Sequence, residues 1–163
     1  MIKENKLETG GFKMSKINKL VIMQGHSSSG KSSFAKQFAK DTDIIISTDD
    51  YFMENGIYKF NEEYLEQYHK NTFNDCVNAM KVSSGTYEKE NAGFSIWLDN
   101  TNTKPEHVKP YLEQAKKYGF QVVYVRMTSS IFDERFAKTH WTFGANEEVM
   151  EQQKKNLEVY KYD

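Results

Sequence analysis

The sequence predicts an α/β fold in which a parallel sheet of about four to five strands is covered by helices on both faces. Short, continuous apolar runs alternate along the chain with segments whose apolar residues recur at helical spacing. Strands that are apolar throughout are typical of a parallel sheet buried on both faces. Polar motifs follow directly after several of these runs, at the edge of such a sheet where ligands bind.

The elements are expected in a regular order. Apolar runs predict strands at 20–23, 44–47, 94–98 and 121–125. Periodicity and end signals predict helices at 33–40, 61–82, 105–118, from 130 onward, and 146–160. Asn61 is the expected cap of the long second helix, Pro105 suits a first helical turn, and Ser130 with Asp133 fits a capping box.

The chain reads as a single domain preceded by a short polar segment. It has 163 residues and a mass of 19.1 kDa, which is enough to bury a core without disulfides or metals. Residues 1–13 are polar and aperiodic, so they are either a disordered lead or a segment before a true start at Met14. Residues 14–163 are expected to form one domain.

Composition excludes several classes of protein. With 22 basic and 23 acidic residues the net charge is −1, which excludes a nucleic-acid binder driven by charge alone, although a local patch for a nucleic-acid end remains possible. The single cysteine, Cys76, excludes a disulfide framework, and a reducing cytoplasm is the simplest location. No apolar run approaches the ~20 residues of a membrane span, so no membrane partner is expected. The oligomeric state stays open.

A phosphate-binding loop is predicted between the first strand and the first helix. Gly25-His-Ser-Ser-Ser-Gly-Lys-Ser32 fits the pattern G-x-x-x-x-G-K-[ST] in the required context. Lys31 would reach the β- and γ-phosphates of ATP, and Ser32 would ligate Mg²⁺. This motif predicts the three-layer fold of the P-loop NTPases. The expected nucleotide-binding residues are Gly25, Ser28, Ser29, Gly30, Lys31, Ser32 and Ser33.

Carboxylates follow the second and third strands. Asp49 and Asp50 end the second strand, where an aspartate can take the proton of an acceptor hydroxyl; the alternative is a solvated turn or a helix cap. Asp99 and Asn100 end the third strand, where an acid would lie near Mg²⁺ or its waters. The alternative for Asp99 and Asn100 is an Asx-type turn before the next helix.

Four further side chains are candidates for contacts with substrate or phosphate. His69 falls within an apolar helical stripe, so we expect a buried, hydrogen-bonded core histidine, with substrate contact as the alternative. Arg135 and Lys138 share one helical face and are expected in a helical lid that neutralises the transferring phosphoryl group. Arg126 directly follows the fourth strand and either faces the site or caps the sheet edge.

Taken in order, these motifs resemble the P-loop kinases of the polynucleotide 5′-hydroxyl kinase family. The resemblance covers about residues 19–160 and is closest to the small AAA-type ATP-binding proteins related to that kinase domain. It implies that Asp49 is the general base, that Lys31 and Ser32 are phosphate and Mg²⁺ ligands, and that Asp99 and Asn100 are a strand-end acid and amide pair. The segments that carry it are Gly25–Ser32, Ser47-Thr-Asp-Asp-Tyr-Phe52, Tyr58-Lys-Phe60, His69 and Asp99-Asn-Thr-Asn102.

Two departures from the family pattern stand out. Many members have Pro-Gly where this chain has Ser27-Ser28. Members also carry arginines in a lid segment that ends in glycine, whereas the corresponding stretch here, Lys138-Thr-His-Trp-Thr-Phe-Gly144, has none. Arg135, one turn upstream, would have to substitute, with Lys138 assisting.

The expected function is that of an ATP-dependent kinase with Lys31, Asp49 and Arg135 as catalytic residues. The first expectation for the acceptor is a polynucleotide or nucleotide 5′-hydroxyl. One alternative is a small-molecule kinase acting on a nucleoside or an antibiotic. The other is a nucleotide-binding module that has lost catalysis, which the missing lid arginines would explain.

Overall fold

The computed structural model describes residues 17–85, 93–128 and 147–162. The strands are β1 Lys19–Gln24, β2 Ile44–Ile46, β3 Met53–Glu54, β4 Ile57–Tyr58, β5 Ser95–Leu98 and β6 Gln121–Arg126. The α-helices are α1 Lys31–Phe38, α2 Leu65–Gly85, α3 Pro105–Lys117 and α5 Glu147–Glu158. Two 3₁₀ helices, η1 Thr48–Phe52 and η2 Glu62–Tyr64, precede β3 and α2.

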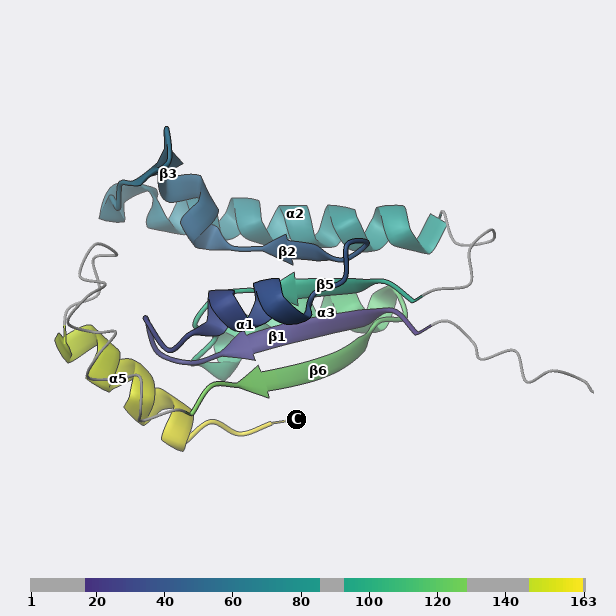
Figure 1. Ribbon diagram of the computed structural model, residues 1–163. Helices are drawn as coiled ribbons and strands as arrows, with labels where there is room; N and C mark the ends of the chain where they lie inside the picture. The colour runs from purple at the N-terminus through teal and green to yellow at the C-terminus, as the bar shows by residue number, and fades with distance from the viewer. Residues whose placement is uncertain (1–16, 86–92, 129–146, 163) are drawn as a thin grey trace, which may run out of the picture.

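Four of the strands form one parallel sheet in the order β2-β5-β1-β6 (Figure 1). In its register Leu20 of β1 lies opposite Ile96 of β5 and Val122 of β6. The strands therefore end at a common edge, and the segments that follow them meet there. The prediction of a parallel α/β sheet with about four strands is confirmed.

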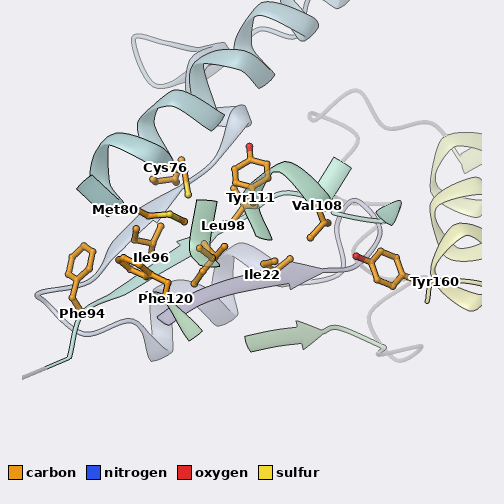
Figure 2. Packing of buried hydrophobic residues seen from close by; sticks show 13 residues of the cluster. Ile22, Cys76, Met80, Phe94, Ile96, Leu98, Val108, Tyr111, Phe120 and Tyr160 are labelled. Carbon is orange, nitrogen blue, oxygen red and sulfur yellow. The ribbon is translucent and has the colours of Figure 1, made fainter. Parts of the chain in front are cut away.

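Alternation along the central strand builds a core on each face of the sheet. Leu20 and Ile22 of β1 face α2 and α3, where they meet Met80 and Val108 among others (Figure 2). Val21 and Met23 face α1, where they pack with Ala35 and Trp97. This layer arrangement is the expected one, because each strand is apolar on both sides.

The second helix differs from its prediction at both ends. Asn61 does cap the segment, since its side chain accepts the Glu63 N–H at 3.0 Å, but the first turn is the 3₁₀ helix η2. The α-helix then continues to Gly85, three residues beyond its predicted end at position 82. Tyr64 lies in this 3₁₀ turn and is 51% exposed.

A short antiparallel hairpin, β3–β4, was not predicted. Met53 pairs with Tyr58 and Glu54 with Ile57 across a two-residue turn. Asn55 (φ 51°) and Gly56 (φ 77°) both take left-handed backbone conformations, as a type I′ turn requires. The Asn-Gly pair is a recognised hairpin signal, and it was the sequence feature that would have revealed this element.

Two expectations concern parts of the chain outside the described residues. The polar lead 1–13 lies there, and so does the helix expected from 130 onward, with its proposed lid role. The single-domain interpretation of 14–163 stays a prediction. Within the described part of the chain, no helix is long and apolar enough to cross a membrane.

The packing predicts a large stability difference between two aliphatic truncations. Leu98→Ala, at a fully buried position, should lower the free energy of unfolding by about 2–5 kcal/mol because it leaves a cavity in the core. Val82→Ala, at a side chain that is 68% exposed, should change it by no more than about 0.5 kcal/mol. Urea titration followed by circular dichroism measures both, and equal effects would contradict the assignment of this core.

Candidate active site at the carboxyl ends of the strands

The predicted phosphate-binding loop, which we call the phosphate loop, runs from the end of β1 to the start of α1, and its two glycines are required sterically. A Cβ atom at Gly25 would lie 2.4 Å from Ser29 Oγ and 3.2 Å from Met127 Cβ. Gly30 caps α1 with φ 90°, a left-handed conformation that disfavours other residues. Ser28 is also left-handed, at φ 64°. The loop is therefore tightly curled before the helix begins.

Lys31 lies folded over this loop. Its Nζ donates a hydrogen bond to the His26 carbonyl at 2.8 Å, and the side chain is buried. Burial lowers the pKa of Lys31 to about 8, an effect that the nearby charges of Asp99 and Asp49 oppose. A phosphate arriving at the loop would supply an ion-pair partner, which this buried cation does not have among the described residues.

Asp99 is the buried carboxylate of the site. It follows β5, is 6% exposed and accepts a hydrogen bond from the Ser32 hydroxyl, while its Oδ1 atom has no partner among the described residues. Burial raises its pKa, and the Ser32 hydrogen bond and the Lys31 charge act in the opposite direction. A hydroxyl beside an unsatisfied carboxylate oxygen is the hard-oxygen donor set that Mg²⁺ prefers, so these residues fit the ion.

Asp49 reaches the same edge from β2. Its N–H donates to Ser47 Oγ at 3.2 Å at the start of η1. The neighbouring Thr48 N–H donates to Asn100 Oδ1 at 2.9 Å, which ties η1 to the end of β5. Asn100 thus positions the segment that carries Asp49. The charge of Asp49 acts on both Lys31 and Asp99, so these three side chains share one electrostatic environment.

Tyr58 holds the Asp49 carboxylate from the hairpin. Its hydroxyl donates to Asp49 Oδ1 at 3.1 Å. Burial and the Asp49 charge raise the pKa of Tyr58, so the phenol stays protonated and remains a donor. No role was predicted for Tyr58 itself, because its position depends on the hairpin that the sequence reading omitted.

Asp50 lies in a different environment from Asp49. It lines an open pocket of about 210 Å³ with Tyr51 and Asp75, and the Tyr51 hydroxyl donates to Asp75. Burial and the Asp49 charge raise the pKa of Asp50, whereas Lys36 lowers it. Asp49 therefore acts on the charges of both Lys31 and Asp99, whereas Asp50 lines a groove along β2 and its charge reaches Asp99.

His69 is not the buried core histidine that the periodicity predicted. It is exposed, because Thr72, three residues on, occupies the buried position of this face of α2. His69 Nδ1 lies 3.3 Å from Thr48 Oγ1, and Thr48 Oγ1 also lies 2.9 Å from Thr72 Oγ1. The partial burial of its imidazole and the charge of His107 lower the pKa of His69, and the charge of Asp49 acts in the opposite direction. His69 thus lies beside the segment that carries the proposed base.

Of the three candidate cations, Arg126 alone lies among the described residues. Arg126 ends β6 with its guanidinium over the rings of Tyr160 and Tyr162, at 5.9 and 5.3 Å. Its Nε and Nη2 atoms are buried without a hydrogen-bond partner in the described part of the chain. Arg135 and Lys138 lie outside the described residues. The structure therefore brings together Lys31, Ser32, Asp49, Asp99 and Asn100, and the roles of all these residues stay predictions.

This chain is similar in sequence or in fold to several known proteins. NEDD4-binding protein 2 of Homo sapiens is 35% identical over 107 residues, which are 64% of this chain and 6% of that protein. A chain of the Pnkp1/Rnl/Hen1 RNA repair complex superimposes with a TM-score of 0.62 at 16% identity, covering 88% of this chain and 45% of that one. A kinase-like protein from Chloroflexus aurantiacus, described as a possible kinase, gives a TM-score of 0.54 at 12% identity, covering 85% and 76%.

These matches differ in what they establish. The two structures are too distant in sequence to show more than the fold, and this chain spans only a small part of the human protein and less than half of the RNA-repair chain. A family model described as an AAA domain matches residues 20–160, which includes every described element of the main sheet except the first residue of β1. The chain therefore belongs to the AAA-domain family and has the fold of the P-loop kinases.

Proposed function

We propose that this protein is an ATP-dependent kinase that transfers a γ-phosphoryl group to a hydroxyl. The observation that carries the proposal is the placement of Asp49 beside the phosphate loop, within electrostatic reach of Lys31 and Asp99. An ATP-binding site alone needs the loop and a carboxylate near Mg²⁺. A second carboxylate, exposed and held by its own donor, suits proton removal from an acceptor.

On this proposal the phosphate loop holds ATP and Asp49 receives the proton. Backbone N–H groups of the loop and the positive end of α1 bind the phosphates, and Lys31 moves from the His26 carbonyl to the phosphate oxygens. Ser32 and Asp99 would hold Mg²⁺, which neutralises phosphate charge when bound. The Tyr58 hydrogen bond orients the Asp49 carboxylate toward the acceptor.

Our first candidate for the acceptor is the 5′-hydroxyl of a nucleotide or polynucleotide. The sequence resemblance stated above supports it, and so does the fold shared with a chain of an RNA repair complex. Exposed rings in the segment after the hairpin suit the stacking of a base: Phe60, whose ring lies 5.1 Å from that of Phe52, is 47% exposed, and Tyr64 is 51% exposed.

One observation favours a second candidate, a small acceptor that is uncharged or cationic. Residues 49–75, which we call the acceptor wall, are strongly acidic, and their two lysines are paired: Lys59 with Glu54 at 2.6 Å and Lys70 with Glu66 at 2.8 Å. Such a wall repels a polyanion. The acidic residues are Asp49, Asp50, Glu54, Glu62, Glu63, Glu66 and Asp75.

Incubation with γ-labelled ATP and a panel of acceptors tests the proposal. The panel contains a 5′-hydroxyl oligonucleotide, a nucleoside and an amine-bearing sugar. Label on the oligonucleotide supports the first candidate, and label only on a small molecule supports the second. Tight ATP binding without label on any acceptor would overturn the kinase proposal in favour of a nucleotide-binding module.

The lowered pKa of Lys31 predicts a pH-dependent affinity for ATP. The empty site loses the Lys31 cation as the pH rises through about 8, so ATP affinity should be constant below that pH and fall above it. Because bound phosphate favours the cation, ATP binding at pH 8–9 should take up protons. Calorimetry in buffers of different ionisation enthalpy measures both effects.

Two variants at position 31 are the controls. Lys31→Ala should bind ATP weakly at every pH, and Lys31→Arg should lose the pH dependence because its guanidinium stays charged. Wild-type affinity that is flat from pH 7 to 9.5 would contradict the assignment of Lys31.

The different environments of the two aspartates predict unequal effects. Asp49→Asn should lower transfer by about 10²–10⁴-fold while ATP affinity changes only a few fold, because the amide cannot accept the proton. Asp50→Asn should be much milder, since Asp50 faces the groove along β2. Single-turnover transfer rates and ATP titrations measure the two, and small, equal effects would reduce the pair to a structural turn.

The remaining catalytic prediction concerns the arginines. Arg135→Ala should lower transfer by about 10²-fold or more with a much smaller loss of ATP affinity, because a guanidinium neutralises the moving phosphoryl group. Lys138→Ala should cost less, since an ammonium gives no bidentate contact. If Arg135→Ala and Arg126→Ala both leave the rate unchanged, no arginine serves the chemistry.

A further inference from the structure

The last described helix contacts the phosphate loop directly. Gln153 of α5 accepts the backbone N–H of Ser27 at 2.8 Å, across 126 positions of sequence. Ser27 lies in the middle of the loop, between Gly25 and the left-handed Ser28. One neutral side-chain oxygen therefore satisfies a loop amide from outside the loop.

A second contact from the same segment reaches Gln24, the residue directly before the loop. The Tyr162 hydroxyl donates to Gln24 Oε1 at 2.7 Å, and Gln24 is the last residue of β1. Gln24 is fully buried, and its Nε2 donates to the Asn102 carbonyl at 3.0 Å. Tyr162 is thereby connected to the strand ends on which the loop is built.

Packing fixes the segment that carries Gln153 and Tyr162. Leu157 and Tyr160 are 7% and 9% exposed, and the ring of Tyr160 lies 4.9 Å from that of Tyr162. The Arg126 guanidinium lies over both rings. In Figure 1, α5 lies beyond the carboxyl ends of the strands, on the side of the phosphate loop.

We propose that residues 147–162 form a clamp on the phosphate loop, with Gln153 and Tyr162 as positioning residues for ATP binding. Loop amides bind phosphates only while they converge, and this loop holds that curl with left-handed residues at Ser28 and Gly30. The clamp holds the loop at Ser27 and at the preceding Gln24, which lowers the conformational entropy that the loop loses when the phosphates bind. The inference rests on the proposed ATP binding.

The neutral charge of Gln153 is part of the proposal. A glutamate at position 153 is isosteric and would accept the same N–H, so the empty loop would keep its shape. Its negative charge, however, would face the phosphates and weaken their binding. Gln153→Glu should therefore weaken ATP binding while keeping the hydrogen bond to the Ser27 N–H. A purely structural role of Gln153 would not produce this result.

The first experiment compares two adjacent glutamines of α5. Gln153→Ala should weaken ATP binding by about 3- to 10-fold, the range expected for one hydrogen bond. Gln152→Ala is the matched control: Gln152 is exposed, bonds Asn156 at 3.0 Å within the helix, and should leave ATP affinity unchanged. Tyr162→Phe keeps the ring and removes only the hydroxyl, so it should weaken ATP binding by a similar factor.

The second experiment isolates the bond itself. Ser27→Pro removes the N–H that Gln153 accepts, so adding Gln153→Ala to it should cause no further loss of ATP affinity. Gln153→Glu should bind ATP more weakly than Gln153→Ala at low salt, and the difference should shrink as salt is added. If Ser27→Pro fails to fold, the comparison of Gln153→Glu with Gln153→Ala still decides the test.

The outcomes separate the clamp from the function on which it rests. If the wild-type protein does not bind ATP, the proposed function fails. If it binds ATP and Gln153→Ala matches Gln152→Ala in affinity, the clamp is overturned and the function stands. Additive losses in the Ser27→Pro and Gln153→Ala pair would also overturn it, because two changes that remove one bond cannot add.

Discussion

The site depends on one buried junction, Asn102, which fastens the end of β1 to the end of β5. Its side-chain amide donates to the Met23 carbonyl at 2.7 Å and to the Leu98 carbonyl at 3.3 Å. Asn102 is 5% exposed and takes a left-handed conformation, with φ 47°, that asparagine tolerates better than most residues. Because Gly25 and Asp99 follow these two strand ends, the junction sets the distance between the phosphate loop and the buried carboxylate.

The buried charges at the carboxyl-terminal edge of the sheet lower the folding stability of the protein. Burial disfavours the charged form of both Lys31 and Asp99, and their mutual attraction offsets this only in part. Asp99 Oδ1 and two nitrogens of Arg126 have no hydrogen-bond partner within 17–85, 93–128 and 147–162, which adds to the same cost. A structure selected for stability alone would fill these positions with apolar side chains. Retention of such groups around one loop is consistent with a site that is completed by a charged ligand.

The sequence predicted what local chemistry decides and missed what depends on the rest of the chain. Four apolar runs placed the sheet correctly, and one glycine-lysine motif placed the curled loop between β1 and α1, because a doubly buried strand and a curled loop leave few other choices of residue. Phosphate binding by that loop stays a prediction. His69 was misplaced since helical spacing alone does not say which neighbouring position, here Thr72, takes the buried face. The hydrogen bond between Gln153 and the Ser27 N–H joins residues 126 positions apart, and no local sequence pattern predicts it.

The proposed base, Asp49, depends on the hairpin β3–β4 for the hydrogen bond that it accepts from Tyr58. Each strand of the hairpin has two residues, and Met53 and Ile57 are 43% and 61% exposed, so its apolar burial is mainly that of Tyr58, whose ring lies 5.9 Å from the ring of Phe52. A ribbon of this size is marginally stable by itself and opens at a fraction of the free energy of global unfolding. Tyr58 would leave Asp49 with it, while the sheet and the phosphate loop stay folded. On the proposed function, warming would then disrupt the acceptor half of the site before the nucleotide half. The protein would still bind ATP at a temperature at which phosphoryl transfer had already stopped.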